Sequence, residues 1–174
     1  MAEAAASAID ARLFRSVLGQ FATGITVVTC TDEQGEPHGM TANSFVSISL
    51  EPPLVLVSVD VRTRMQALLA RAGRYGVSVL REDQRALSDR FAGRAGEPDV
   101  AFGWHDGVPV LDGALATLVC RVRAAHDAGD HCLHVGEVEC CERRDGAPLL
   151  FHAGRYARVG ANHLHEQGRT REHR

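Results

Sequence analysis

The residues best suited to ligand chemistry lie between Gly39 and Pro53, where apolar and neutral polar side chains interleave. The polar positions are Thr41, Asn43, Ser44, Ser47 and Ser49. Hydroxyls and an amide both donate and accept hydrogen bonds, whereas a solvated strand more often carries charged side chains. The pattern predicts a strand whose polar side meets the edge of a neutral heteroaromatic ring. A plain Ser/Thr-rich edge strand would give the same pattern.

A second candidate is the histidine of Gly129-Asp130-His131. Gly and Asp suit a tight turn, so His131 is expected at the start of a strand, where an imidazole can stack on or hydrogen-bond to a nicotinamide. A turn histidine that is simply solvated is the alternative. Neighbouring Cys and His residues resemble a zinc cluster, but strand alternation separates them and no C-x-x-C or H-E-x-x-H spacing occurs, so we predict no metal site.

Two further segments combine positive charge with hydrogen-bonding groups. Ser58, Arg62 and Thr63 precede a predicted helix, whose first N–H groups would favour a phosphate. A capped surface helix with solvated arginines explains them equally. At the other end of the chain, Arg155 could pair with a pyrophosphate and Tyr156 could pack against a ring, or the pair could simply end an apolar strand.

These residues need a scaffold of strands, which the apolar periodicity supplies. Strands are predicted over 25–31, 38–50, 54–59, 75–80, 114–125, 132–142 and 149–152. A helix is predicted over 11–21, capped by Asp10 or Ser7 and stopped at Gly24. Two further helices are predicted, one that begins after Thr63 and one over 83–91. Residues 93–112 are predicted to form an irregular loop. Sequential strands with short turns favour a mostly antiparallel barrel or sandwich. The dinucleotide fingerprint G-x-G-x-x-G is absent, which argues against a Rossmann domain.

Composition limits the function. The chain has 174 residues, which predicts a single domain, and a net charge of −3, which gives no reason to expect nucleic-acid binding. All 19 basic residues are arginine, which excludes Schiff-base lysines and Walker-type phosphate lysines. No apolar run approaches a membrane span and no secretory signal is visible. Five cysteines, an odd number, favour a reducing compartment, so we expect a cytoplasmic protein.

Several ordered motifs resemble those of the short-chain flavin reductases, the reductase halves of two-component flavin monooxygenases. They are GMTANSFVSISLEPPLVLVSV at 39–59, GDH at 129–131, HAGRY at 152–156, FATGITVVT at 21–29 and PVLDGALATLVC at 109–120. The resemblance spans roughly 14–159, nearly the whole chain. Ordered motifs at compatible spacing are more specific than any single one.

The resemblance implies a mostly β fold, an FMN-binding, Greek-key-like split β-barrel with a few short helices. We expect a flavin reductase-like domain over 11–159 and a flexible N-terminus over 1–10. The polar composition of 160–174 predicts a disordered tail. The implied activity is hydride transfer from NADH or NADPH to FMN or FAD, which supplies reduced flavin to a flavin-dependent monooxygenase. A homodimer is expected. A flavin-binding redox module without nicotinamide turnover and a split-barrel FMN-dependent oxidase remain alternatives.

The resemblance also implies roles for individual residues. It assigns His131 to nicotinamide binding and hydride transfer. Small side chains at Ala42 and Ser44 would let the flavin ring approach closely, and Phe91-Ala92 resembles another flavin-contacting step, although Phe91 could equally be a core residue. The full set of expected cofactor contacts is Thr41, Ala42, Asn43, Ser44, Ser47, Ser58, Arg62, Thr63, Phe91, Ala92, Asp130, His152, Gly154, Arg155 and Tyr156.

Overall fold

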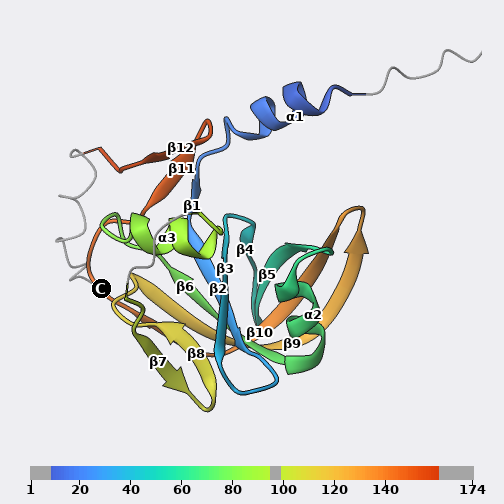
Figure 1. The fold of residues 1–174 in the computed structure, drawn as a ribbon, viewed down its shortest axis with the longest axis vertical. Coiled ribbons are helices and arrows are strands. Elements are labelled where there is room, and N and C mark those ends of the chain that lie inside the picture. The colour runs from blue at the N-terminus through green and yellow to red at the C-terminus, as the bar shows by residue number, and fades with distance from the viewer. Residues whose placement is uncertain (1–8, 95–98, 161–174) are drawn as a thin grey trace, which may run out of the picture.

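The computed structural model describes residues 9–94 and 99–160 (Figure 1). Most of the predicted flexible N-terminus and of the predicted disordered tail therefore lies outside the described residues. The helices are α1 (Ala11–Leu18), α2 (Arg64–Ala72) and α3 (Arg85–Phe91). The strands are β1 (Thr23–Gly24), β2 (Thr26–Thr31), β3 (Pro37–Ala42), β4 (Phe45–Leu50), β5 (Pro53–Asp60), β6 (Arg74–Val79), β7 (Phe102–His105), β8 (Val108–Leu111), β9 (Ala116–Ala128), β10 (His131–Arg143), β11 (Leu150–His152) and β12 (Arg155–Ala157).

The central element is an antiparallel seven-stranded sheet in the order β3-β2-β6-β9-β10-β5-β4. The sheet curls without closing into a barrel. Its two edge strands, β3 and β4, are consecutive in the chain and joined through Asn43-Ser44. We call the place where these two edges face each other the seam. The prediction of a mostly β fold is confirmed.

The predicted continuous strand over 38–50 is wrong, because the chain changes partner at the seam. Ala42 pairs with Thr26 on β2, whereas Phe45 pairs with Val57 on β5. Ala42 and Phe45 both face the core although they are three residues apart, so the alternation of side chains is interrupted at Asn43-Ser44. In the sequence, the polar pair Asn43-Ser44 and the apolar pair Phe45-Val46 mark this interruption.

Apolar side chains fill the interior of the curled sheet, and α2 covers it. Met65, Leu68 and Leu69 of α2 are buried against valines of the sheet, each contributing about 1.5–3 kcal/mol by leaving water. Thr63 accepts a hydrogen bond from the Gln66 N–H and so caps α2, as predicted. The cap and the apolar stripe together fix where this helix begins and which face it buries.

The predicted irregular loop over 93–112 is wrong in its second half, which forms the β7–β8 hairpin. Asp106 and Gly107 both have positive φ, 49° and 80°, as two-residue hairpin turns require. The hairpin crosses close over the sheet at Gly76, where an added Cβ would lie 2.4 Å from the Pro109 carbonyl oxygen. The Thr29 hydroxyl donates to that same carbonyl. The hairpin is therefore held against the sheet by close packing at Gly76 and by hydrogen bonds, which include the one that the Leu111 N–H donates to the Ser78 hydroxyl at 2.9 Å.

Helix α1 is shorter than predicted and is not covered by any of the residues that the structure describes. The helix ends at Leu18 with Gly19 as its C-cap, so the prediction that it stops at Gly24 is wrong. Its N-cap is Asp10, one of the two residues predicted for that position. None of its residues is buried, and Leu13 and Val17 are each 59% exposed. Figure 1 shows α1 projecting away from the sheet. Exposed apolar faces of this kind are typical of surfaces where proteins associate.

One buried histidine makes stability depend on pH. His134 is 1% exposed, and its Nε2 lies 2.6 Å from the Gln66 Oε1. The amide oxygen accepts, so Nε2 carries the proton, and Nδ1 has no partner within the described chain. Burial lowers the pKa of His134 below its ordinary value of 6.5. Folded protein then binds this proton at lower pH than the unfolded chain, so stability is complete above about pH 6.5 and falls as pH drops below it.

We therefore expect His134→Gln to flatten the decline of the unfolding midpoint between pH 8 and pH 5. The slope that this single group contributes is at most about 1.4 kcal/mol per pH unit. Urea unfolding at fixed pH values measures it. His126→Gln, at an exposed histidine on β9, is the control that should keep the wild-type slope. Equal slopes for wild type and His134→Gln would contradict the assignment.

Candidate functional site

The turn that joins β3 to β4 lies between two cavities of about 160 and 340 Å³, and Asn43 lines both. The Thr41 hydroxyl donates to the Ser88 carbonyl at 2.7 Å, and the Ser44 hydroxyl donates to the Ser58 carbonyl at 2.7 Å. Both oxygens can still accept a hydrogen bond. The exposed Asn43 amide makes no hydrogen bond within the described residues, so it offers both a donor and an acceptor to a ligand.

The two cavities differ in their walls. The smaller one has a mixed lining of Ile25, Thr41, Asn43, Ser88, Ala92, Arg94, Phe151 and Tyr156. The larger one is mainly apolar, lined by Phe21, Ala22, Thr23, Gly24, Thr26, Asn43, Phe45 and Val79. Apolar walls with a few convergent polar groups are typical of sites for planar organic ligands.

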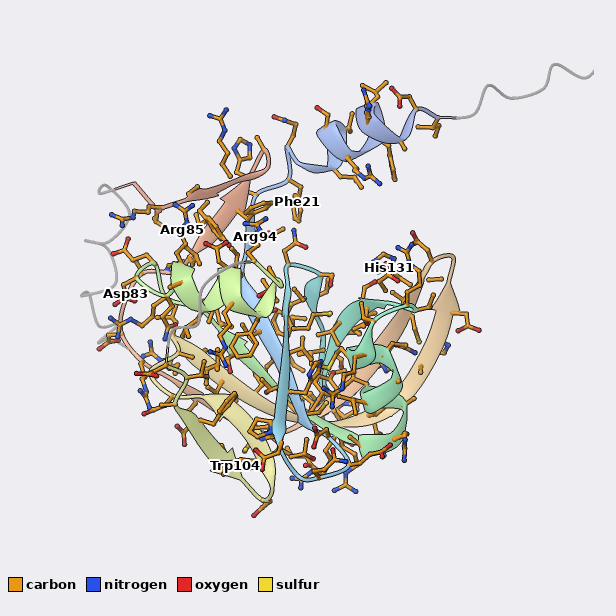
Figure 2. All side chains as sticks on the ribbon, in the orientation of Figure 1. Phe21, Asp83, Arg85, Arg94, Trp104 and His131 are labelled. Atoms are coloured by element: carbon orange, nitrogen blue, oxygen red, sulfur yellow. The ribbon has the colours of Figure 1, made fainter. Side chains whose placement is uncertain are left out.

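The β9–β10 turn presents His131 at the same end of the molecule. Figure 2 shows His131 on one side of the β3–β4 turn and Phe21 and Arg94 on the other. His131 begins β10, as predicted, and its Nδ1 lies 2.7 Å from the Asp130 Oδ1. This hydrogen bond lowers the pKa of Asp130 and fixes the imidazole, leaving Nε2 directed elsewhere. The ring is 42% exposed and accessible to a ligand.

Beside His131, the segment between β5 and α2 is held by its own hydrogen bonds. Arg62 binds both carboxylate oxygens of Asp60, at 3.0 and 2.6 Å, and this pairing lowers the pKa of Asp60. The Thr63 hydroxyl donates to the Asp60 carbonyl at 2.8 Å. Asp60 pairs with His131 across the sheet. A phosphate here would meet the start of α2 and a guanidinium that is already shared with a carboxylate.

On the other side of the turn, Tyr156 is packed and anchored. Its hydroxyl lies 2.7 Å from the Asp89 Oδ1 and 3.0 Å from the Ser88 Oγ. The Arg85 guanidinium lies 4.7 Å from the ring centroid, and Phe151 meets the ring edge-on at 5.7 Å. The hydrogen bond from Tyr156 lowers the pKa of Asp89.

The turn, its two cavities and His131 thus lie at one end of the molecule, and comparison with known proteins bears on this site directly. Residues 18–160 match the model of the flavin reductase like domain. The chain belongs to this family.

The similarity between this flavin reductase domain and its relatives extends over most of the length of both chains. The domain is 53% identical over 146 residues to an NADH-dependent flavin reductase of a Rhodococcus species, covering 82% of each chain. It is 42% identical over 159 residues to the HsaB reductase subunit of a flavin-dependent monooxygenase from Rhodococcus jostii, covering 89% of this chain and 81% of that one. The structure of the Streptomyces globisporus NADH:FAD oxidoreductase SgcE6 with NAD and FAD fragments superposes with a TM-score of 0.80 at 36% identity, covering 91% and 99%. The split-barrel architecture and the oxidoreductase class predicted above are thereby confirmed.

Within the flavin reductase domain, the predicted site residues fall into two groups around the turn. Thr41, Ala92 and Tyr156 gather at the smaller cavity, whereas Ser44, Ser58, Arg62, Thr63, Asp130 and His131 lie toward the β9–β10 turn. Asn43 connects the two groups, and Ala42 is buried behind it. The β3–β4 turn thus lies between two sets of candidate contacts.

Other predicted contacts lie elsewhere. Ser47 is exposed on the edge strand β4, and His152, Gly154 and Arg155 are exposed at the tip of the β11–β12 hairpin. Phe91 packs in the core with Phe102 at 6.4 Å, the alternative that the sequence left open. Their roles as cofactor contacts stay predictions.

The structure adds residues that the sequence reasoning did not assign to the site. Phe21 to Gly24 and Thr26 line the larger cavity, and the motif FATGITVVT that contains them was the available signal. Ser88, Arg94 and Phe151 line the smaller cavity and carried no local signal. Across residues 9–94 and 99–160, no three His, Cys, Asp or Glu side chains are grouped as metal ligands, and no helix is long and apolar enough to span a membrane.

Proposed function

We propose that this flavin reductase uses NADH to reduce flavin at the β3–β4 turn, and that it supplies reduced flavin to a separate monooxygenase. The observation that carries the proposal is the unpartnered Asn43 amide at the mouth of two cavities, with His131 at the same end of the molecule (Figure 2). The relatives support it, since one is named an NADH-dependent flavin reductase and another a monooxygenase reductase subunit.

The residues of the turn suit the polar edge of an isoalloxazine. The flavin supplies the redox chemistry, accepting a hydride from the nicotinamide. The Asn43 amide would donate to a ring acceptor and accept from a ring N–H, and the hydroxyl oxygens of Thr41 and Ser44 would accept as well. His131, held by Asp130, would orient the nicotinamide so that the reacting atoms lie about 3–3.5 Å apart.

The phosphate end would lie at the start of α2, near Ser58, Arg62 and Thr63. The first N–H groups of that helix point along its axis out of its N-terminal end, where they could donate to a phosphate. Arg62 could bind a phosphate only by sharing its guanidinium with Asp60. We propose FMN or FAD as the flavin, and the name of the Rhodococcus relative favours NADH over NADPH.

We further propose that the protein is a cytoplasmic homodimer. All five cysteines are free thiols, consistent with a reducing compartment. The uncovered face of α1 and the exposed Val46 and Ile48 of β4 are two apolar surfaces on one chain. A second copy would cover both.

Val17→Asp is therefore expected to weaken the dimer, because it places a charge in the middle of the α1 face. Sedimentation velocity across micromolar concentrations measures the change. Arg12→Asp, on the same helix outside that apolar set, is the control. A wild-type protein that sediments as a monomer would overturn the dimer proposal.

The activity is tested by NADH oxidation at 340 nm with and without FMN or FAD. Flavin-dependent turnover with NADH preferred over NADPH is expected. Bound flavin without NADH oxidation would instead favour the redox module, and turnover of a small oxidisable substrate with bound FMN would favour the oxidase. Absence of both binding and turnover would overturn the proposal.

A further inference from the structure

Helix α3 forms one wall of the smaller cavity and contacts β3 at two points. The Thr41 hydroxyl donates to the Ser88 carbonyl at 2.7 Å. One turn further along, the Phe91 ring fills the space above Gly39, where an added Cβ would lie 2.6 Å from a ring carbon. The helix has only 7 residues and no side-chain hydrogen bond at its N-cap. Such a short helix is unstable alone, so its place depends on its contacts.

Helix α3 is also held by Tyr156 of β12, which contacts both Ser88 and Asp89. Ser88 is fully buried, and its hydroxyl lies 3.0 Å from the Tyr156 hydroxyl. The phenol has a single O–H, which donates a hydrogen bond to the Asp89 carboxylate at 2.7 Å. Arg94 binds the same Asp89 oxygen at 2.9 Å. Ser88 thus stands between Tyr156, through its hydroxyl, and Thr41, through its carbonyl.

We propose that Tyr156 is a positioning residue for the flavin site: it holds Ser88, and through Ser88 it fixes the Thr41 end of the β3–β4 turn. This rests on the proposed function, which places flavin at that turn. Arg85 already lies over the Tyr156 ring and Phe151 meets its edge. Tyr156 therefore acts through its hydroxyl rather than by stacking on the ligand. The coupling would set flavin affinity while the nicotinamide side, around His131, stays unchanged.

A double-mutant cycle on flavin affinity tests the coupling. Tyr156→Phe removes only the hydroxyl, whereas Thr41→Val removes the donor to Ser88 together with the oxygen that would accept from the flavin. Tyr156→Phe is expected to weaken the flavin Kd about 5-fold, and Thr41→Val by at least as much. The double variant should bind flavin about as weakly as Thr41→Val alone, since Tyr156 acts on the flavin only through Thr41. At saturating flavin, the kcat of Tyr156→Phe and its KM for NADH should stay within about twofold of wild type, which a general loss of structure would not allow. Flavin fluorescence quenching and steady-state assays give these values.

Tyr156→Phe combined with Ser44→Ala is the matched control pair. Ser44 binds Ser58 on the opposite side of the turn, so these two effects should multiply. An unchanged Kd in Tyr156→Phe would overturn the inference. So would effects of Tyr156→Phe and Thr41→Val that multiply.

The outcomes separate this inference from the proposed function. If Thr41→Val binds flavin as wild type does, the turn is not the flavin site and both fail. If Thr41→Val weakens binding and Tyr156→Phe does not, only the positioning role fails. Should Tyr156→Phe not fold, Ser88→Ala replaces it in the cycle, because it removes the Ser88 hydroxyl, keeps the carbonyl and favours the helix.

Discussion

Replacing His131 by alanine is expected to slow NADH-driven flavin reduction about 10–100-fold while the flavin Kd stays within about twofold of wild type. His131 begins β10 on a tight turn, and its Nδ1 hydrogen bond to Asp130 holds the ring in one orientation. Without the imidazole the nicotinamide loses the group that we propose orients it, whereas the Asn43 turn is untouched. Stopped-flow absorbance of flavin mixed with NADH measures the rate, and fluorescence titration measures the affinity.

His126→Ala is the matched control for this result. His126 is an exposed histidine on the adjacent strand of the same hairpin, opposite Leu133. It should keep the wild-type reduction rate. An unchanged rate in His131→Ala would remove this histidine from the reaction, and a large loss of flavin affinity would move it to the flavin site.

The second large effect concerns folding. Gly76→Ala is expected to destabilise the protein by about 3 kcal/mol, near the upper end for overpacking. The added methyl would lie 2.4 Å from the Pro109 carbonyl oxygen and 2.6 Å from the Thr29 hydroxyl. Neither neighbour is the free end of a flexible side chain, because the two are hydrogen-bonded to each other across β2 and β8. Thermal unfolding should show a midpoint lower by about 6–12 °C.

Gly103→Ala provides the comparison within the β7–β8 hairpin. An added Cβ there meets nothing closer than 3.7 Å, an ordinary van der Waals contact. Its midpoint should stay near that of wild type. Equal midpoints for both variants would show that the hairpin can shift away from β6 at little cost.

Much of the fold follows from local signals in the sequence. The β-branched run over 25–31 and the apolar run over 54–59 correspond to β2 and β5, and Thr63 caps α2 because its hydroxyl precedes an apolar helical stripe. The Asp106-Gly107 pair was also a readable hairpin signal, although the surrounding Gly and Pro residues favoured a loop.

The parts that could not be predicted depend on contacts distant in sequence. At Asn43-Ser44 the chain changes from pairing with β2 to pairing with β5, and no local pattern encodes this choice of partner strands. Ser88 enters the site through its backbone carbonyl, which every residue possesses. The burial of Ser88 and its hydrogen bond with Tyr156, 68 residues away, likewise depend on tertiary structure.

The seam has a kinetic consequence. Strands β3 and β4 are each hydrogen-bonded to a strand on one side only, so this is where the sheet opens locally at least cost. A ligand seated there can exchange with solvent without disturbing β6, β9 or β10. Residence at such a site is set by a few contacts at the turn, and this suits a molecule that departs after each catalytic cycle better than one that is kept for the life of the protein.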